Sequence, residues 1–188
     1  MKDFNDTPLW LFSLNFYSLE RVRESLLAFQ DFSGANVNIL LLLLWLASRR
    51  RSLSLNEVDE IIGSTNSWNK NVVIPLRKIR QNLKKNDEGI VSENSFLLRE
   101  KIKILEFEAE KIEQRALFDA YNIRSFGKFQ TEIGAAARTN LKTYEQLLET
   151  SFPEPNFEFI VETMVKRLHG GSDITGSIKT WQTCFLSL

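Results

Sequence analysis

Three polar side chains, Asp31, Asn36 and Asn38, directly precede a strongly apolar segment. Residues 39–47 are all apolar, so a helix there has no polar face and must be buried on every side. The polar side chains therefore lie near the centre of the fold, where they could line a small pocket for a polar ligand or a cation. They could instead cap the helix, because Asn36 would accept hydrogen bonds from first-turn amides and Asp31 would face the positive helix end. We favour capping and keep the pocket as the alternative.

Two further residues, Trp68 and Arg77, would complete such a pocket. Pro75 lies inside the helix predicted over residues 67–85, and a proline within a helix removes a hydrogen bond and kinks the chain. Arg77 follows the kink and could point back into the bundle to bind Asp31. The basic stretch 77–85 could bind nucleic acid, but no glycine-rich loop or interleaved aromatic residue accompanies it. The favoured role of this stretch is therefore either to complement the negative C-terminal end of its own helix or to form salt bridges to an acidic helix.

The acidic helix is predicted over residues 95–121 and carries Glu106, Glu108, Glu110 and Glu113. A di-metal carboxylate bundle would need Glu-x-x-His pairs, and the only histidine is His169, three residues after Lys166. We therefore predict a solvated acidic face and no metal site. The inward face should be the apolar seam with heptad spacing, which consists of Leu98, Ile102, Leu105, Ala109, Ile112 and Ala116.

Catalytic and cofactor motifs are absent from the 188 residues. There is no Ser-His-Asp order, no phosphate-binding glycine loop and no metal-spaced Cys/His set. The single cysteine, Cys184, excludes an intrachain disulfide. Twenty-four basic residues balance 24 acidic ones, so no global charge favours nucleic acid or an anionic membrane. We predict no catalytic residue and no cofactor, and the sequence favours a non-enzymatic protein.

Apolar residues at helical spacing predict an all-α protein, a compact bundle of seven or eight helices with a kinked helix at Pro75. Thr7 and Pro8 are typical of a helix start. Ser54 and Glu57 form a capping box that opens a short helix ending at Gly63. Small residues at 134–137 would let another helix approach closely.

The Pro-Glu-Pro motif at 153–155 is the best candidate boundary in the chain. We predict a bundle domain over residues 1–151 and a helical extension over 152–188, docking on the bundle or on a partner chain. Ile178, Trp181 and Phe185 lie at helical spacing in this extension. We expect them to form the surface that binds a protein partner or a second copy, since aromatic residues dominate such interfaces.

Several motifs together resemble one family. They are Leu9-Trp10-x-Phe12; Leu26-Leu27-x-Phe29-Gln30-Asp31 with Gly34-Ala35-Asn36-Val37-Asn38 and the leucine-rich run to Ala47; Trp68 with Val72-Val73-x-Pro75-Leu76-Arg77-x-x-Arg80; and Lys103-x-x-Glu106-x-Glu108-x-Glu110 with Asn140-Leu141-x-x-Tyr144. The pattern is similar to the all-helical proteobacterial family called domain of unknown function 2390, over roughly residues 7–150. The resemblance implies a helical fold and a bacterial cytoplasmic setting, and it implies no activity.

The function that the sequence favours is a protein-interaction or regulatory module. A ligand-binding or enzymatic bundle with a pocket at Asp31, Asn36, Asn38, Trp68 and Arg77 is the alternative. Nucleic-acid binding through the basic stretch is the weakest hypothesis. The N-terminus has no signal-peptide pattern, and the apolar run 39–47 is about half of the roughly 20 residues that a membrane span needs. We therefore expect a cytoplasmic protein.

Overall fold

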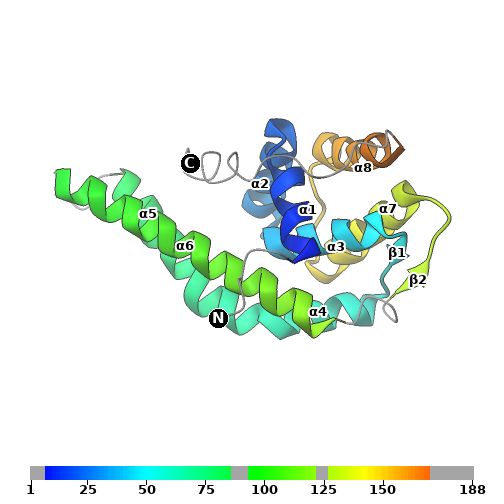
Figure 1. Ribbon diagram of the computed structural model, residues 1–188, viewed down its shortest axis with the longest axis horizontal. Coiled ribbons are helices and arrows are strands. Elements are labelled where there is room, and N and C mark those ends of the chain that lie inside the picture. The colour runs from blue at the N-terminus through cyan, green and yellow to red at the C-terminus, as the bar shows by residue number, and fades with distance from the viewer. Residues whose placement is uncertain (1–6, 86–92, 122–126, 170–188) are drawn as a thin grey trace.

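The computed structural model describes residues 7–85, 93–121 and 127–169, and these are almost entirely helical (Figure 1). The helices are α1 (Pro8–Tyr17), α2 (Glu20–Ser33), α3 (Val37–Ser48), α4 (Leu55–Trp68), α5 (Ile74–Lys85), α6 (Glu93–Ala120), α7 (Ile133–Leu147) and α8 (Glu154–His169). A π-turn, Asn69–Val73, joins α4 to α5. Two short strands, β1 (Arg51–Ser52) and β2 (Lys128–Phe129), form an antiparallel pair. The predicted all-α bundle is confirmed, with α4 and α5 forming one kinked helix.

Helix α3 is the centre of the core. Every residue from Asn38 to Ala47 is buried, and α1, α2, α6 and α7 pack around the helix. The side chain of Asn36 accepts a hydrogen bond from the amide of Asn38 at 2.9 Å, so Asn36 caps the helix as predicted. The polar start of α3 is thereby fixed at the middle of the molecule.

The kink at Pro75 is accommodated by the π-turn before it. The amide of Ile74 donates to the carbonyl of Asn69, five residues earlier, and this wider turn relieves the chain where Pro75 has no amide to donate. The capping box of Ser54 and Glu57 is confirmed. The predicted end at Gly63 is wrong, because α4 continues through this glycine to Trp68.

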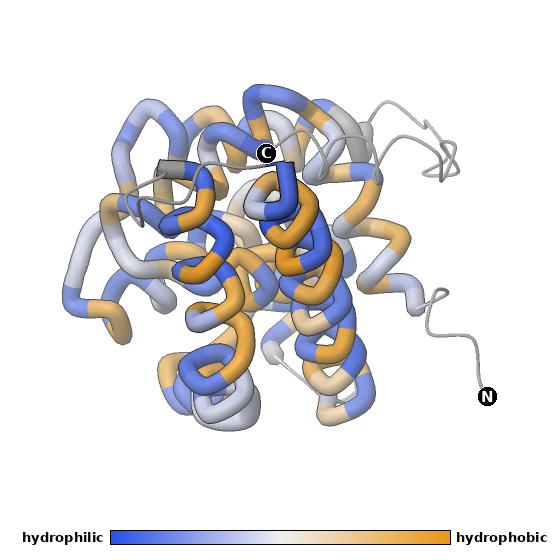
Figure 2. The backbone as a smooth tube through the Cα atoms, turned by 90° about the vertical axis from the view of Figure 1, so that its left-hand side faces the viewer, coloured by the Kyte–Doolittle hydropathy of each residue, from blue (hydrophilic) through white to orange (hydrophobic). Residues whose placement is uncertain are grey.

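Helices α5 and α6 form an antiparallel hairpin that projects from the rest of the bundle (Figure 1). In Figure 2 hydrophobic and hydrophilic residues alternate along both helices of the hairpin. The predicted inward seam of α6 is wrong for Leu98 and Leu105, each 48% exposed, and for Ile112, 43% exposed, whereas Ala109 of the seam is buried.

The residues of α6 that face the interior are mostly polar. The buried ones are Lys103, Glu106, Ala109, Glu113, Gln114 and Leu117. The predicted solvated role of the acidic residues is thus wrong for Glu106 and Glu113, although Glu108 is exposed. The apolar and polar sets have the same alternating three- and four-residue spacing, so periodicity alone could not decide which one turns inward.

Asn140 on α7 ties three segments together. Its side chain accepts from the amide of Leu53 at 2.7 Å and donates to the carbonyls of Leu43 and Arg51, both at 3.0 Å. Gly127 lies beside β1 with a φ of +73°, a left-handed conformation that favours glycine, and a Cβ there would lie 2.7 Å from the carbonyl oxygen of Ser52. These contacts fix β1 between α3 and α7.

Helix α8 packs against α2 and α7, with Phe157, Ile160 and Met164 in the core. Gly134 allows this approach, since a Cβ there would lie 2.8 Å from the side chain of Val165. The described part of the predicted extension therefore packs on the bundle, and the division into two domains stays a prediction. Ile178, Trp181, Phe185 and Cys184 lie outside the described residues. None of the described helices is long and apolar enough to cross a membrane.

Candidate functional site

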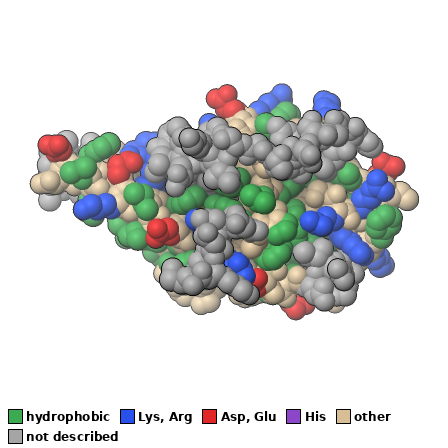
Figure 3. All heavy atoms as spheres, in the orientation of Figure 1, with side chains coloured by type: hydrophobic (Ala, Val, Ile, Leu, Met, Phe, Trp, Pro, Cys, Tyr) green, Lys and Arg blue, Asp and Glu red, His purple; other side chains and the backbone are tan. Residues whose placement is uncertain are grey.

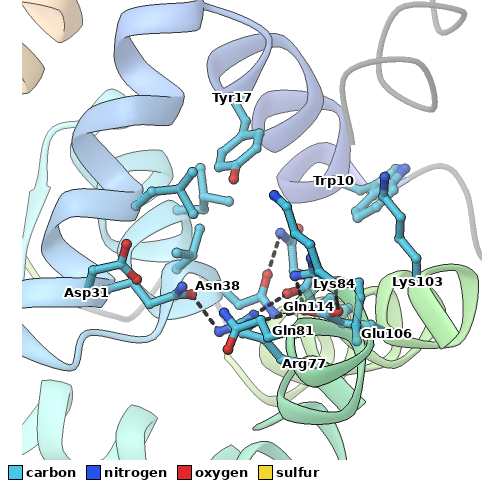
Figure 4. A pocket seen from close by; sticks show the side chains of 16 residues that line it. Trp10, Tyr17, Asp31, Asn38, Arg77, Gln81, Lys84, Lys103, Glu106 and Gln114 are labelled. Atoms are coloured by element: carbon cyan, nitrogen blue, oxygen red, sulfur yellow. Dashed lines mark hydrogen bonds and ion pairs between the residues drawn. The ribbon is translucent and has the colours of Figure 1, made fainter. Parts of the chain in front are cut away.

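A pocket of about 300 Å³ opens between the hairpin and the start of α3 (Figure 4). Helices α1, α2, α3, α5 and α6 all contribute to its wall. The lining residues are Trp10, Tyr17, Leu27, Gln30, Asp31, Val37, Asn38, Leu41, Arg77, Arg80, Gln81, Lys84, Lys103, Glu106, Glu110 and Gln114. In Figure 4 Tyr17 points from α1 toward the α5 side chains, Asp31 lies at one side, and Trp10 and Lys103 lie at the other.

Arg77 is the centre of the polar wall. Its guanidinium lies 2.9 Å from a Glu106 oxygen and 2.6 Å from a Glu110 oxygen, and it donates to the Gln30 side chain at 2.6 Å. Arg80 binds the other oxygen of Glu106 at 2.5 Å. Arg77 thus points into the bundle as predicted, but the predicted contact with Asp31 is wrong, because the partner that α2 supplies is the neighbouring Gln30. The predicted salt bridges between the basic stretch and α6 are confirmed.

A second set of polar side chains, centred on Glu113, lies behind the ion pairs of Arg77 and holds the start of α3. Glu113 is fully buried and accepts from the amide groups of Asn36 at 2.7 Å and Asn38 at 2.6 Å. The side chain of Gln114 donates to Asn38 at 2.9 Å. The Oε1 atom of Gln114 is buried and has no hydrogen-bond partner among the described residues. A buried acceptor without a partner costs about 1–3 kcal/mol, so this atom is suited to accept a hydrogen bond from a donor in the pocket.

Burial and neighbouring charges shift the pKa values of several side chains that line the pocket. The pKa of Glu110 is raised to about 7, first because burial disfavours its carboxylate and then because the carboxylates of Glu106 and Glu113 repel it, while Arg77 opposes the shift. Burial and the nearby Glu110 likewise raise the pKa of Tyr17. Burial alone would lower the pKa of Arg77, but Glu110 and Glu106 outweigh this effect and raise it. Glu110 is therefore able to exchange a proton near neutral pH.

Positive charge gathers at the other side of the pocket. The Lys103 side chain is buried, and its pKa is lowered first by that burial and then by the cations Arg99, Arg80 and Lys84, whereas Glu100 raises it. Lys84 makes no hydrogen bond or ion pair with the residues that the structure describes. Since Arg80 is paired with Glu106, Lys84 is the cation of this wall that an anion in the pocket would approach.

The structure brings together three of the five residues predicted for a ligand pocket. Asp31, Asn38 and Arg77 line the cavity. Asn36 lies behind it as the helix cap, and Trp68 packs away from it, with its indole N–H donating to the Ala109 carbonyl at 3.0 Å. The side chain of Asn38 also bonds the neighbouring helix α6, through Glu113 and Gln114.

Sequence reasoning missed the contribution of α6, namely Lys103, Glu110 and Gln114 as lining residues. The available signal was the three- and four-residue spacing of Lys103, Glu106, Glu110 and Glu113, which places all four on one helix face. Among the described residues no group of three or more His, Cys, Asp or Glu side chains is arranged to hold a metal ion. The arginine between Glu106 and Glu110 occupies the place that a cation would take.

Residues 8–117 match a family described as a protein of unknown function, DUF2390. The matched segment contains every residue that lines the pocket, while the Asn140-Leu141-x-x-Tyr144 motif of α7 lies beyond it. Neither the curated proteins nor the solved structures show a significant match to the chain. Because the match covers more than half of the chain, the protein belongs to this DUF2390 family of unknown function.

Proposed function

We propose that the protein binds a small molecule in the pocket between the α5–α6 hairpin and the start of α3. The observation that carries the proposal is the polar inner face of α6, which turns Lys103, Glu106 and Glu110 toward a cavity while leucines on the same helix face solvent. Ligand sites in proteins combine a concave, partly apolar wall with a few convergent polar groups. Titratable groups with shifted pKa values in such a cavity support the same function.

The two sides of the pocket indicate the chemistry of the ligand. Arg80, Lys84 and Lys103 supply positive charge for a phosphate or a carboxylate. The unpartnered Oε1 of Gln114 and the carboxylate of Asp31 accept hydrogen bonds, which suits a hydroxyl or an ammonium group. A cavity of about 300 Å³ is at the small end of the range for ligand sites. The ligand is therefore a compact molecule with an anionic group and a hydrogen-bond donor.

The test is calorimetric titration of the full chain with three probes: inorganic phosphate, glycerol 3-phosphate and phosphoethanolamine. Lys84→Gln should weaken binding by about tenfold or more, because it removes one pocket cation. Lys78→Gln is the matched control, since Lys78 is exposed on the same helix and outside the pocket lining. Equal affinities of the two variants, or no heat with any probe, would contradict the proposal.

Asp31→Asn tests whether Asp31 contacts the hydrogen-bond donor of the ligand and not its anionic group. It should weaken binding of phosphoethanolamine and leave inorganic phosphate unchanged, because only the former carries an ammonium group. Asp31 is exposed at the pocket edge, so this variant should keep the melting temperature of the natural chain. An equal loss for both probes would show that Asp31 does not contact the donor end.

A protein-interaction module in the bacterial cytoplasm is the second candidate function, and the exposed leucines of α6 favour it. The predicted partner surface at Ile178, Trp181 and Phe185 remains a prediction. Replacing Trp181 and Phe185 by alanine in the full chain should weaken association with little change in melting temperature. Light scattering and thermal melts of the two variants measure these effects, and an unchanged solution mass would contradict a role for these residues.

A further inference from the structure

Helix α6 carries an apolar face that none of the described helices covers. Leu97, Leu98, Ile104, Leu105 and Ile112 are between 43% and 50% exposed, and they lie on the side of α6 away from Glu106 and Glu113. In Figure 3 hydrophobic side chains lie along the projecting hairpin. Exposed apolar residues that are contiguous along a helix are typical of an interaction surface.

Two charged residues divide this face. Lys101 and Glu108 are exposed and lie on the same side of the helix as Ile104 and Leu105, one turn to either side of them. The face therefore has an apolar pair at one end and at the centre and the single Ile112 at the other end, with a positive charge in one half and a negative charge in the other. Reversing the helix about the point between Ile104 and Leu105 exchanges Leu97 with Ile112 and Lys101 with Glu108, whereas Leu98 comes opposite Lys111.

We infer that the occupant of this face is α6 of a second copy, packed antiparallel about a twofold axis between Ile104 and Leu105. In that register Leu97 faces Ile112 of the second copy, Lys101 faces Glu108, and Ile104 faces Leu105. A twofold axis repeats each contact, so every Lys101 meets an opposite charge. Parallel packing in register would instead place Lys101 beside Lys101 and Glu108 beside Glu108, which is unfavourable.

The shape of the molecule suits this arrangement. The hairpin projects from the bundle, so the outer part of α6 is accessible to a second helix (Figure 1). From Leu97 to Ile112 the face is roughly 22 Å long at 1.5 Å per residue. Its spacing of three and four residues is the one that packs two helices at a shallow angle. This contact is separate from the ligand pocket, which lies on the opposite side of α6.

The experiment is sedimentation equilibrium of the full chain from about 1 to about 100 µM. The expected mass is twice 21.8 kDa. Leu105→Glu should raise the dissociation constant more than about 100-fold, because it buries a carboxylate at the twofold axis. Phe32→Glu is the matched control, since Phe32 is an apolar residue of α2 that is 79% exposed and lies outside the face.

Charge reversal tests the register. Lys101→Glu or Glu108→Lys alone should weaken the dimer by about tenfold, whereas the double variant should restore it, because only antiparallel self-packing pairs the two positions. A monomeric full chain overturns the inference, as does a dimer that survives Leu105→Glu. A double variant no better than either single variant overturns the antiparallel register. Circular dichroism of each variant distinguishes loss of association from loss of folding.

Discussion

Replacement of Glu110 by glutamine tests the electrostatics of the pocket. The pKa of Glu110 is about 7 in the folded protein and 4.5 in the absence of a protein environment. Between these two values the folded state holds a proton that the unfolded chain has lost, so stability falls as the pH rises. A shift of about 2.5 units at about 1.4 kcal/mol per unit makes this loss about 3 kcal/mol.

Glutamine keeps the shape of the side chain and can accept the 2.6 Å hydrogen bond from Arg77, but it cannot ionise. At pH 4.5 and below, the difference in the free energy of unfolding between the variant and the natural chain should stay constant. Between pH 4.5 and 8 the variant should gain about 3 kcal/mol relative to the natural chain, because only the natural chain loses its proton. The free energy of unfolding is measured from urea denaturation followed by circular dichroism at intervals of pH.

Asp59→Asn is the control, since Asp59 is an exposed carboxylate of α4 that lies outside the pocket lining and outside the apolar face of α6. If the difference between Glu110→Gln and the natural chain is the same at pH 4.5 and pH 8, the burial of Glu110 does not shift its ionisation. That result would refute the assignment of Glu110 as the group that exchanges a proton near neutral pH.

Three further predictions concern the scaffold. Asn140→Ala should lower the free energy of unfolding by about 3 kcal/mol in urea, because three backbone groups, two of them fully buried, lose their partner. Gln146→Ala, at an exposed position of the same helix, should change it by less than about 0.5 kcal/mol. Gly127→Ala should lower the melting temperature, whereas Gly63→Ala, where a Cβ meets nothing within 4 Å, should raise stability by about 0.5–1 kcal/mol. Ser54→Ala should cost about 1 kcal/mol through the lost cap, and a melt identical to that of the natural chain would contradict this.

The buried centre of the fold was predictable because its signal is local. A helix that is apolar on every side, as over residues 39–47, has only one stable location, and Asn36 before it has one obvious capping role. The kink at Pro75 follows from the missing amide of proline. The candidate pocket was predictable in part for the same reason, since Asp31 and Asn38 flank the buried helix and Arg77 follows the kink.

The contribution of α6 was not predictable from periodicity. Glu106 follows Leu105, and Glu113 follows Ile112, so the acidic face and the apolar face differ by a rotation of only about 100°. A choice based on hydrophobicity alone turns Leu105 and Ile112 inward. The correct choice depends on partners distant in sequence, because Arg77 and Asn38 supply the groups that satisfy the buried carboxylates.

The polar network therefore determines the rotation of α6 through the groups that the rotated packing would leave unpaired, and not through any large gain from the salt bridges themselves. Burying a salt bridge such as Arg80–Glu106 seldom stabilises a protein more than apolar residues of the same volume would, because both charges lose their hydration. Turning Leu105 and Ile112 inward would gain apolar burial, yet it would leave Arg77 and Asn38 facing leucine. Such unpaired buried groups are costly, so the network excludes the rotated packing. The same rotation keeps charges around the pocket and leucines on the outer face, and each proposed interaction depends on it.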